Sequence, residues 1–366
     1  MRASPAPSDL WWRDRIREAD YDSIDDFVSR FGLAPYRLAQ IYRAATKQLV
    51  TDVADMSVLP AGLRPGLAAS LRMSSVTVKH AATSADGQTT KLLLTLRDDR
   101  EVEAVLMRHH MRRTTACISS QAGCALKCDF CATGQGGFMR NLTALEIFDQ
   151  AVTLARRARD EGKALTNLVF MGMGEPFLNY EAVMDAIALL NDAHGLNLGA
   201  RHITVSTAGV VPGIQRFTSE RSQVNLAVSL HAPDDALRTK LMPINKKWPI
   251  GVLMRAVEEY VATTRRKVFY EYLLLSGEND RPSDARQLAD LLGGPLHHVN
   301  LIPYNATDAP YSRSHPAAVR RFQEILRERG VPSTIRHTMG DDIAAACGQL
   351  RAEKQPKAHR EQTLLS

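Results

Sequence analysis

From about residue 114 onward, segments with a strand pattern alternate with segments with a helical pattern. Short runs rich in β-branched and aromatic residues, such as LTNLVFMG and KVFYEYLLL, are separated by amphipathic stretches such as YEAVMDAIALLNDAHG. Strands that alternate with helices form βαβ units, whose strands lie parallel in one sheet. Six such units predict an α/β fold with a partial, barrel-like (β/α)6 sheet. In barrels of this kind, chemistry gathers at the C-terminal ends of the strands.

The part of the sequence before this series has a different pattern. Over residues 1–75 apolar residues recur at helical spacing, as in PYRLAQIYRAATKQL, which predicts a small helical domain. TTKLLLTL and REVEAVLM then have the pattern of strands joined by the polar turn RDDR, so we expect residues 76–113 to form a β-rich connector. The barrel is expected over 114–345, and a C-terminal segment over 346–366 whose end forms a solvated or frayed tail.

Composition and charge narrow the class of protein. The chain is 45% hydrophobic and 23% charged, which is typical of a soluble globular protein. No run approaches the roughly 20 apolar residues of a membrane span, and the first residues lack the pattern of a signal peptide. We therefore expect a cytoplasmic protein that binds no membrane. The net charge of +6 mildly favours a polyanionic partner, although a basic enzyme without one fits equally well.

Three of the five cysteines, Cys124, Cys128 and Cys131, stand in a C-x3-C-x2-C array just after the first barrel strand. An odd cysteine count in a cytoplasmic chain favours metal or redox chemistry over a disulfide framework. Thiolates suit Fe–S clusters, zinc or copper(I), and three of them on a [4Fe–4S] cluster leave one iron open for a small molecule. Zinc is the alternative, but structural zinc usually takes four ligands from paired C-x2-C arms.

The array, with Phe130 before its last cysteine, resembles the cluster motif of the radical S-adenosylmethionine (SAM) enzymes. Longer strings are similar to the RlmN/Cfr family of radical SAM RNA methyltransferases: CISSQAGCALKCDFCATGQGGFMRNLTALEI, FMGMGEP, VSTAGVVP, SLHAPDDALR, PINKKW, NLIPYN and GDDIAAACGQL. FGLAPYRLAQIY and DMSVLPAGLR resemble that family's N-terminal accessory domain. The resemblance covers nearly the whole chain apart from its two tails, and it implies a radical SAM partial barrel with an RNA-binding accessory domain.

The resemblance implies methylation of adenosine C2 in 23S rRNA, near the peptidyl-transferase centre, and in tRNA, 3′ of the anticodon. C2 has no lone pair with which to attack a sulfonium methyl group, so the family uses radical chemistry with one [4Fe–4S] cluster and two SAM molecules per turnover. An electron donor such as flavodoxin or ferredoxin is implied, and we expect a monomer. Methylation at C8, the sister activity that confers ribosomal antibiotic resistance, uses the same cysteines and is the alternative.

Carried over position by position, the resemblance implies roles for single residues. Cys347 is expected to carry the methyl group, Cys117 to release the product through a transient disulfide with Cys347, and Glu103 to accept the C2 proton. The expected cluster ligands are Cys124, Cys128 and Cys131. The expected cofactor-contacting residues are Gly174, Glu175, Ser206, Ser229, Leu230, His231 and Asn305.

Each of these roles has a plainer alternative. A lone cysteine such as Cys347 is more often a small buried apolar residue, and Glu103 in an alternating strand would ordinarily lie on the exposed face. The serines and Asn305 could be local hydrogen-bonding groups at strand ends, and His231 a satisfied core histidine. For the whole chain, the alternatives are a zinc-stabilised RNA-binding module without catalysis and a redox sensor that uses Cys117 and Cys347.

The segment MRHHMRR, at 107–113, is more basic than the resemblance leads us to expect. Together with Arg140, Lys246 and Lys247 it is a candidate for contact with RNA phosphates. A solvated run of charges explains it equally well.

Overall fold

One ten-stranded sheet organises the protein in the computed structural model, which describes residues 6–109, 113–293 and 295–350. Within this sheet, β4 and the strands from β7 to β12 pair in parallel, and at least one helix lies between each of these strands and the next of them along the chain. This arrangement confirms the predicted α/β partial barrel. In sheet order the strands are β1 (Val76–Thr83), β2 (Thr89–Leu96), β3 (Glu101–Arg108), β4 (Thr114–Cys117), β7 (Asn167–Phe170), β8 (Ile203–Thr207), β9 (Asn225–Ser229), β10 (Val268–Leu274), β11 (His297–Pro303) and β12 (Ser333–Ile335).

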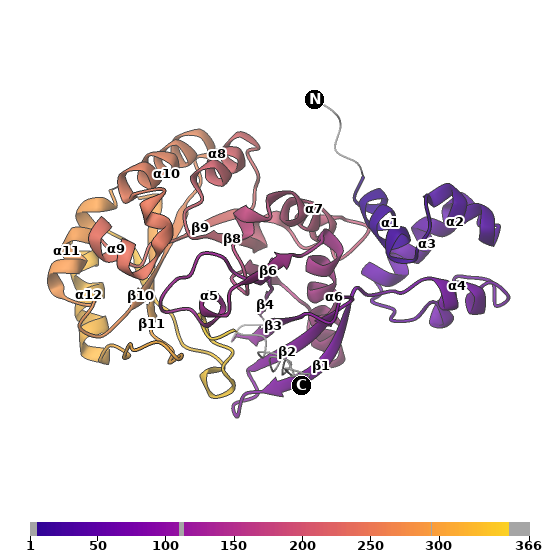
Figure 1. Ribbon diagram of the computed structural model, residues 1–366, viewed down its shortest axis with the longest axis horizontal. Coiled ribbons are helices and arrows are strands. Elements are labelled where there is room, and N and C mark those ends of the chain that lie inside the picture. Colours follow the sequence, from indigo (N-terminus) through magenta and orange to yellow (C-terminus); the bar gives the residue numbers. More distant parts are fainter. Residues whose placement is uncertain (1–5, 110–112, 294, 351–366) are drawn as a thin grey trace, which may run out of the picture.

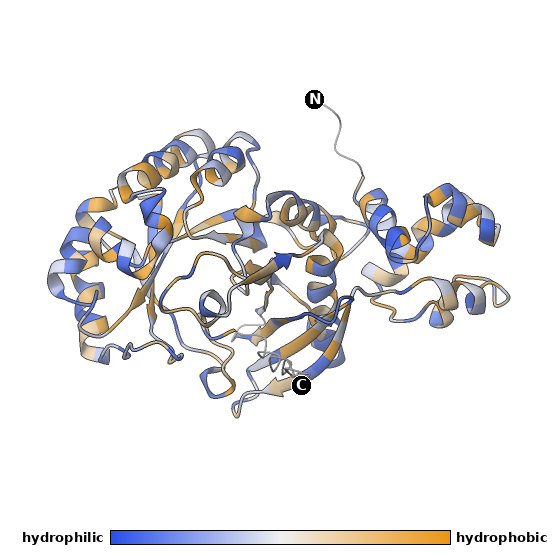
Figure 2. Ribbon diagram, viewed as in Figure 1, coloured by the Kyte–Doolittle hydropathy of each residue, from blue (hydrophilic) through white to orange (hydrophobic). Residues whose placement is uncertain are grey.

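Helices cover the outer face of the parallel strands (Figure 1). Hydrophobic residues concentrate on the strands and on the helix sides turned toward them, as Figure 2 shows. A capping box fixes the start of α6: the Thr143 hydroxyl accepts from the Glu146 amide at 3.1 Å, and the Glu146 carboxylate accepts from the Thr143 amide at 2.9 Å. These helices are α6 (Ala144–Asp160), α7 (Tyr180–Asn191), α8 (Val211–Ser219), α9 (Asp235–Leu241), α10 (Ile250–Thr264), α11 (Pro282–Leu291) and α12 (Pro316–Glu328).

The N-terminal helices form a separate group beside α6 and α7 (Figure 1). Their core is aromatic, with the Trp11 and Trp12 rings 4.9 Å apart. Polar contacts fasten the group to the barrel: among them, Arg15 pairs with Asp149 of α6 at 2.8 Å, and the Tyr42 hydroxyl donates to Asp192 at 2.7 Å. The helices are α1 (Pro7–Glu18), α2 (Ile24–Phe31), α3 (Pro35–Thr46) and α4 (Arg64–Ser70).

Several elements lie outside the sequence expectations. Strand β1 was not predicted, and with β2 and β3 it continues the barrel sheet through antiparallel pairing to β4. The connector is therefore an extension of the barrel sheet. Helices α8 and α9 were also missed; α9 begins where the Asp234 side chain accepts from the Leu237 amide at 2.9 Å.

The chain after β12 returns across the open side of the sheet. The Ala85 amide donates to Asp342 at 2.8 Å and the Lys91 ammonium to the Ala344 carbonyl at 3.2 Å. The expected tail beyond residue 350 lies outside the described residues. Within the described ranges, no helix has the length and apolar character needed to cross a membrane.

Candidate active site

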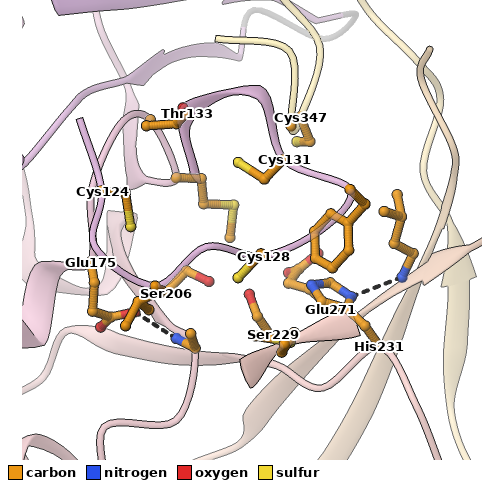
Figure 3. A pocket seen from close by; sticks show the side chains of 18 of the residues that line it. Cys124, Cys128, Cys131, Thr133, Glu175, Ser206, Ser229, His231, Glu271 and Cys347 are labelled. Carbon is orange, nitrogen blue, oxygen red and sulfur yellow. Dashed lines mark hydrogen bonds between the residues drawn. The ribbon is translucent and has the colours of Figure 1, made fainter. Parts of the chain in front are cut away.

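A cavity opens at the C-terminal ends of the barrel strands, where the barrel prediction placed the chemistry (Figure 3). Loops that follow β4, β7, β8 and β9 all contribute side chains to it. Of the residues singled out from the sequence, those that line it are Cys124, Cys128, Cys131, Gly174, Glu175, Ser206, Ser229, His231 and Cys347. Residues that are far apart in the chain thus meet in one cavity.

The cysteine loop wraps around one side of this cavity. It leaves the small hairpin of β5 (Gln121–Gly123) and β6 (Phe138–Asn141), and α5 (Ala132–Gly136) lies between those two strands. The Cys131 amide donates to the Cys128 carbonyl at 3.1 Å, and the Asp129 amide to the Leu241 carbonyl at 2.9 Å. These backbone bonds hold the loop so that three thiols face the same space (Figure 3).

The donor set fits a cluster better than a single zinc ion. Among the described residues, no three Cys, His, Asp or Glu side chains converge closely enough to hold one metal ion. In a cubane cluster each thiolate binds a different iron, so three ligands share a cavity without meeting at one point. Burial raises the pKa of the Cys124 thiol to about 12 and that of Cys128 well above its ordinary value. A bound metal would supply the positive charge that ionised thiols need there.

Glu175 is a buried carboxylate that has no cationic partner among the described residues. One of its oxygens accepts from the Phe177 amide at 3.1 Å and the other from the Ala208 amide at 2.7 Å. Burial raises its pKa to about 7 despite these hydrogen bonds. A carboxylate fixed in this way beside the cysteine loop fits the ammonium group of SAM, which would offset its charge.

The glycines of the β7 strand end are required by packing. A Cβ on Gly174, whose φ is +102°, would lie 2.5 Å from the Gln121 Cβ, and one on Gly172 would lie 2.6 Å from the Ile118 carbonyl oxygen. Both glycines also line the cavity. They let the loop pack closely against β5 and the end of β4.

The hydroxyls of Ser206 and Ser229 face the cavity and have no hydrogen-bond partner among the described residues (Figure 3). His231 is both a satisfied core histidine and a cavity residue, since its Nδ1 accepts from the Leu273 amide at 3.0 Å. Burial lowers its pKa to about 3, so the ring is neutral and its proton is on Nε2. Leu230 is fully buried and does not line the cavity.

A second and larger cavity, of about 420 Å³, lies on the other side of Cys347. Cys117, at the end of β4, lines this cavity, and Cys347 lines both cavities. Asn305 lines it too: its side-chain amide donates to the Cys347 carbonyl at 3.4 Å, while its buried Oδ1 has no hydrogen-bond partner among the residues that the structure describes. An unpartnered buried acceptor of this kind is expected where a ligand supplies the donor. All five cysteines are free thiols.

Glu103 is buried, in contrast to the exposed position that the strand pattern alone favoured. Val105 pairs with Cys117 across β3 and β4, so Glu103, two residues before Val105, lies on the same face of the sheet as Cys117. Its carboxylate pairs with Lys91 at 2.8 Å. Lys91 also donates to the Ala344 carbonyl in the segment 341–350 that carries Cys347, called the Cys347 loop below. Glu103 itself lines neither cavity.

Sequence reasoning missed a polar cluster in the wall between the two cavities. Glu271 of β10 accepts from Asn300 of β11 at 2.9 Å and from Arg336, just after β12, at 3.1 Å. The one available sequence signal is the single carboxylate inside the otherwise apolar and aromatic strand β10. The three residues are far apart in the chain, so no local pattern predicts their contact.

The basic residues proposed to contact RNA fall into two groups. Arg140 is paired with both Asp98 and Glu146, which leaves its charge compensated. Lys246 and Lys247 are exposed, and Lys247 lies over the Trp248 ring at 4.7 Å. Residues 110–112 of the basic segment lie outside the described part of the chain.

Comparison with known proteins gives a consistent result. Residues 118–292 match the model of the radical SAM superfamily. The chain is 47% identical to a probable dual-specificity RNA methyltransferase RlmN of Moorella thermoacetica, over 90% of this chain and 94% of the relative, and 46% identical to its namesake in Chloroflexus aurantiacus, over 90% and 91%. A crystal structure of a radical SAM methyltransferase from Sphaerobacter thermophilus superposes with a TM-score of 0.86 at 50% identity, covering 90% of this chain and 97% of that one.

Proposed function

The chain belongs to the RlmN family of dual-specificity RNA methyltransferases in the radical SAM superfamily, and from that premise we propose that it methylates C2 of adenosine in 23S rRNA and in tRNA. The observation that carries the proposal is the position of two thiols. Cys117 and Cys347 line one cavity, and Cys347 also lines the cavity of the cysteine loop. A sulfur that reaches both cavities can be loaded on one side and deliver a carbon to RNA on the other.

Cys124, Cys128 and Cys131 would hold a [4Fe–4S] cluster whose fourth iron is left for SAM. The SAM molecule would be held by Glu175, by the hydroxyls of Ser206 and Ser229, by the backbone around Gly174 and Leu230, and by His231 and Asn305. When bound, these groups supply a methyl group and, after one-electron reduction, a radical that removes hydrogen from an S-methyl group, with two SAM molecules used per turnover.

The residues of this chain perform the remaining steps. Cys347 takes up the methyl group as a thioether and, after hydrogen removal, forms the bond to C2 that links enzyme and RNA. Glu103, kept in place by Lys91, accepts the C2 proton. One electron leaves the radical adduct together with this proton and would return to the cluster, so that enzyme and RNA are then joined by a closed-shell thioether. The Cys117 thiolate then attacks the Cys347 sulfur, and a disulfide forms. The bond between that sulfur and the transferred carbon breaks, its electron pair stays on the carbon, and the carbon takes one proton to become the methyl group. An external reductant returns both thiols, and a donor such as flavodoxin or ferredoxin reduces the cluster.

The organisation of the chain fits this function. We propose that residues 1–75 form an RNA-binding accessory domain, that 76–113 connect it to the barrel of 114–345, and that 346–366 carry the methyl-bearing cysteine. The enzyme would act as a monomer in the cytoplasm, where both RNA substrates occur.

Replacing Cys117 with Ala tests the scheme directly. The variant should accumulate a covalent enzyme–RNA adduct, because nothing is left to attack the loaded sulfur, and denaturing gels should show the shifted band. Cys347→Ala is the matched control and should form no adduct. Free methylated RNA at the parent rate from Cys117→Ala would contradict the scheme.

Nucleoside mass spectrometry of RNA treated with the parent enzyme separates C2 from C8 chemistry. We expect 2-methyladenosine. A product that contains only 8-methyladenosine would replace the C2 assignment with the sister activity.

A further inference from the structure

The wall between the two cavities contains one arginine for which the proposed chemistry has no role. Five residues line both cavities: Met171, Glu271, Ile302, Arg336 and Cys347. Arg336 is the only cation among them. A group in this position is next to the sulfur that meets the RNA base.

The guanidinium of Arg336 is held firmly on one side and open on the other. Its backbone amide donates to the Leu301 carbonyl at 2.8 Å, and its Nη1 donates to Glu271 at 3.1 Å and contacts the Met171 sulfur at 3.7 Å. Its Nε and Nη2 have no hydrogen-bond partner among the described residues. The side chain is 30% exposed, against 5% for Glu271. Since Arg336 lines both cavities, its open donors face internal space.

Glu271 orients this cation. One of its carboxylate oxygens accepts from Arg336 and the other from Asn300, which fixes the plane of the carboxylate and therefore the direction of the guanidinium. The electrostatics agree with this geometry. The charge of Arg336 partly offsets the rise that burial causes in the pKa of Cys117, and the charge of a Cys347 thiolate adds to the rise in the pKa of Arg336. Arg336 is thus electrostatically coupled to both thiols.

Adenine C2 lies between two ring nitrogens, N1 and N3, which are both hydrogen-bond acceptors. When a carbon radical adds to C2, electron density moves onto these nitrogens. A cationic donor at one of them stabilises the adduct and makes the C2 proton more acidic. Such a donor must lie beside the sulfur that carries the reacting carbon, and Arg336 meets that requirement.

We propose that Arg336, oriented by Glu271 and Asn300, is a catalytic residue that donates a hydrogen bond to a ring nitrogen flanking C2 of the target adenine. The inference rests on the proposed function. Arg336 keeps its proton throughout, while the C2 proton leaves to Glu103 and the bonds made and broken are those already described. The second cavity is then the site of the base, which enters it flipped out of its RNA.

A cycle that combines enzyme and substrate changes tests this contact. In the Cys117→Ala background, single-turnover adduct formation is timed with short RNAs that carry adenosine, 1-deazaadenosine or 3-deazaadenosine at the target position. Arg336→Met should slow adduct formation with adenosine by about 100-fold, and Arg336→Lys, which keeps the charge but not the fork, by about tenfold. In the enzyme that keeps Arg336, one of the two deaza RNAs should form adduct more slowly than the adenosine RNA. In Arg336→Met the same deaza RNA should react as fast as the adenosine RNA, because the contact is already lost.

Two further readouts exclude a structural effect or an effect on the thiol. The mass of the Cys347 peptide should show one added methyl in Arg336→Met, and SAM cleavage to 5′-deoxyadenosine should continue within about threefold of the parent. Arg321→Met, an exposed arginine on α12 that pairs with Glu324 and Glu328, is the matched control and should behave as the parent.

The proposed contact is wrong if Arg336→Met forms adduct at the parent rate. It is also wrong if each deaza RNA slows adduct formation by the same factor in Arg336→Met as in the enzyme that keeps Arg336. Loss of the Cys347 methyl in Arg336→Met would overturn it as well, since Arg336 would then act on the thiol. Should Arg336→Met not fold, Arg336→Lys carries the same cycle. If the Cys117→Ala parent forms no adduct, the proposed function fails, and this outcome is distinct from those above.

Discussion

Two arginine–carboxylate pairs lie in different parts of this protein, one of them fully enclosed and the other half-buried beside a cavity. Arg15, at the contact of α1 with α6, is fully buried; it donates to Glu18, Ser75 and Asp149 and lies over the Trp11 ring at 5.0 Å. Arg336 donates through one nitrogen and leaves the rest of its fork facing a cavity. The first arrangement fastens two parts of the fold, and the second leaves donors for the substrate contact proposed above.

The comparison predicts the largest effect on stability at Asp149. Asp149→Ala removes the fully buried carboxylate partner of Arg15 and leaves it paired with Glu18 alone. We therefore expect the free energy of unfolding to fall by about 3 kcal/mol, the lower end of the cost of breaking a buried pair, as measured by urea denaturation. Glu271→Ala should cost less, because cavity space around Arg336 can admit water to solvate the released charge. If the two variants lose the same stability, the distinction between a closed and an open pair is wrong.

Glu175 tests the fit to SAM. Glu175→Gln removes the carboxylate proposed to bind the ammonium group, and SAM affinity should fall by about 2–5 kcal/mol, measured by calorimetry on the anaerobic enzyme. Asp149→Ala, assayed where it is folded, should keep the parent affinity.

The same carboxylate gives a signed dependence of stability on pH. Because its pKa in the folded protein is about 7, above the ordinary 4.5, ionisation opposes folding. Without SAM, the contribution of Glu175 to stability is complete below pH 4.5 and is lost as the pH rises through 7. Glu175→Gln should lack this loss; a parallel decline in both proteins would assign the dependence to other groups.

The thiol of Cys117 gives the next smaller effect. Burial is the main cause that raises its pKa to about 12, so near neutral pH it is protonated and resolves the adduct slowly. Release of RNA from preformed adduct should accelerate about tenfold per pH unit between pH 7 and 9, which is about 1.4 kcal/mol per unit. A flat profile would show that formation of the Cys117 thiolate does not limit this step.

The smallest effect on stability is expected for an arginine whose ion pairs lie on the surface. Arg216 is exposed, pairs with Glu181 and Glu220, and lies over the Tyr180 ring at 4.2 Å. Arg216→Ala should reduce the free energy of unfolding by no more than about 1 kcal/mol, measured in the same denaturant series. A larger loss of unfolding free energy would show that the ion pairs and the cation–π contact of Arg216 stabilise the protein more than exposed contacts usually do.

Much of the fold was predictable because local patterns encode it. The buried parallel strands are apolar runs bounded by turns, and the Thr143–Glu146 spacing marked the start of α6. Strand β1 escaped because it is an exposed edge with polar residues and therefore has no apolar alternation. Helix α8 escaped because it contains Gly213, which suggests a turn in sequence; a Cβ there would lie 2.6 Å from the Phe177 Cβ.

The site was predictable to the extent that its residues lie in continuous motifs. The cysteine loop and the β7 strand end are such motifs, whereas Glu271, Asn300 and Arg336 come from three strands or strand ends. Their contact depends on the register of β10, β11 and β12, which only the folded sheet fixes. The burial of Glu103 likewise follows from its neighbours in the folded sheet, Lys91, Ser119 and Met173, and not from its own strand pattern.

The Cys347 loop has a consequence for the timing of assembly. Its anchors on Ala85, Lys91 and Thr133 are 217 to 257 residues earlier in the chain. At a synthesis rate of about 5–20 residues per second, tens of seconds separate these anchors from the loop that they hold. The other four cysteines that line the two cavities are therefore made long before the segment that carries Cys347. The newly made chain has no complete reactive centre until its last few dozen residues have emerged.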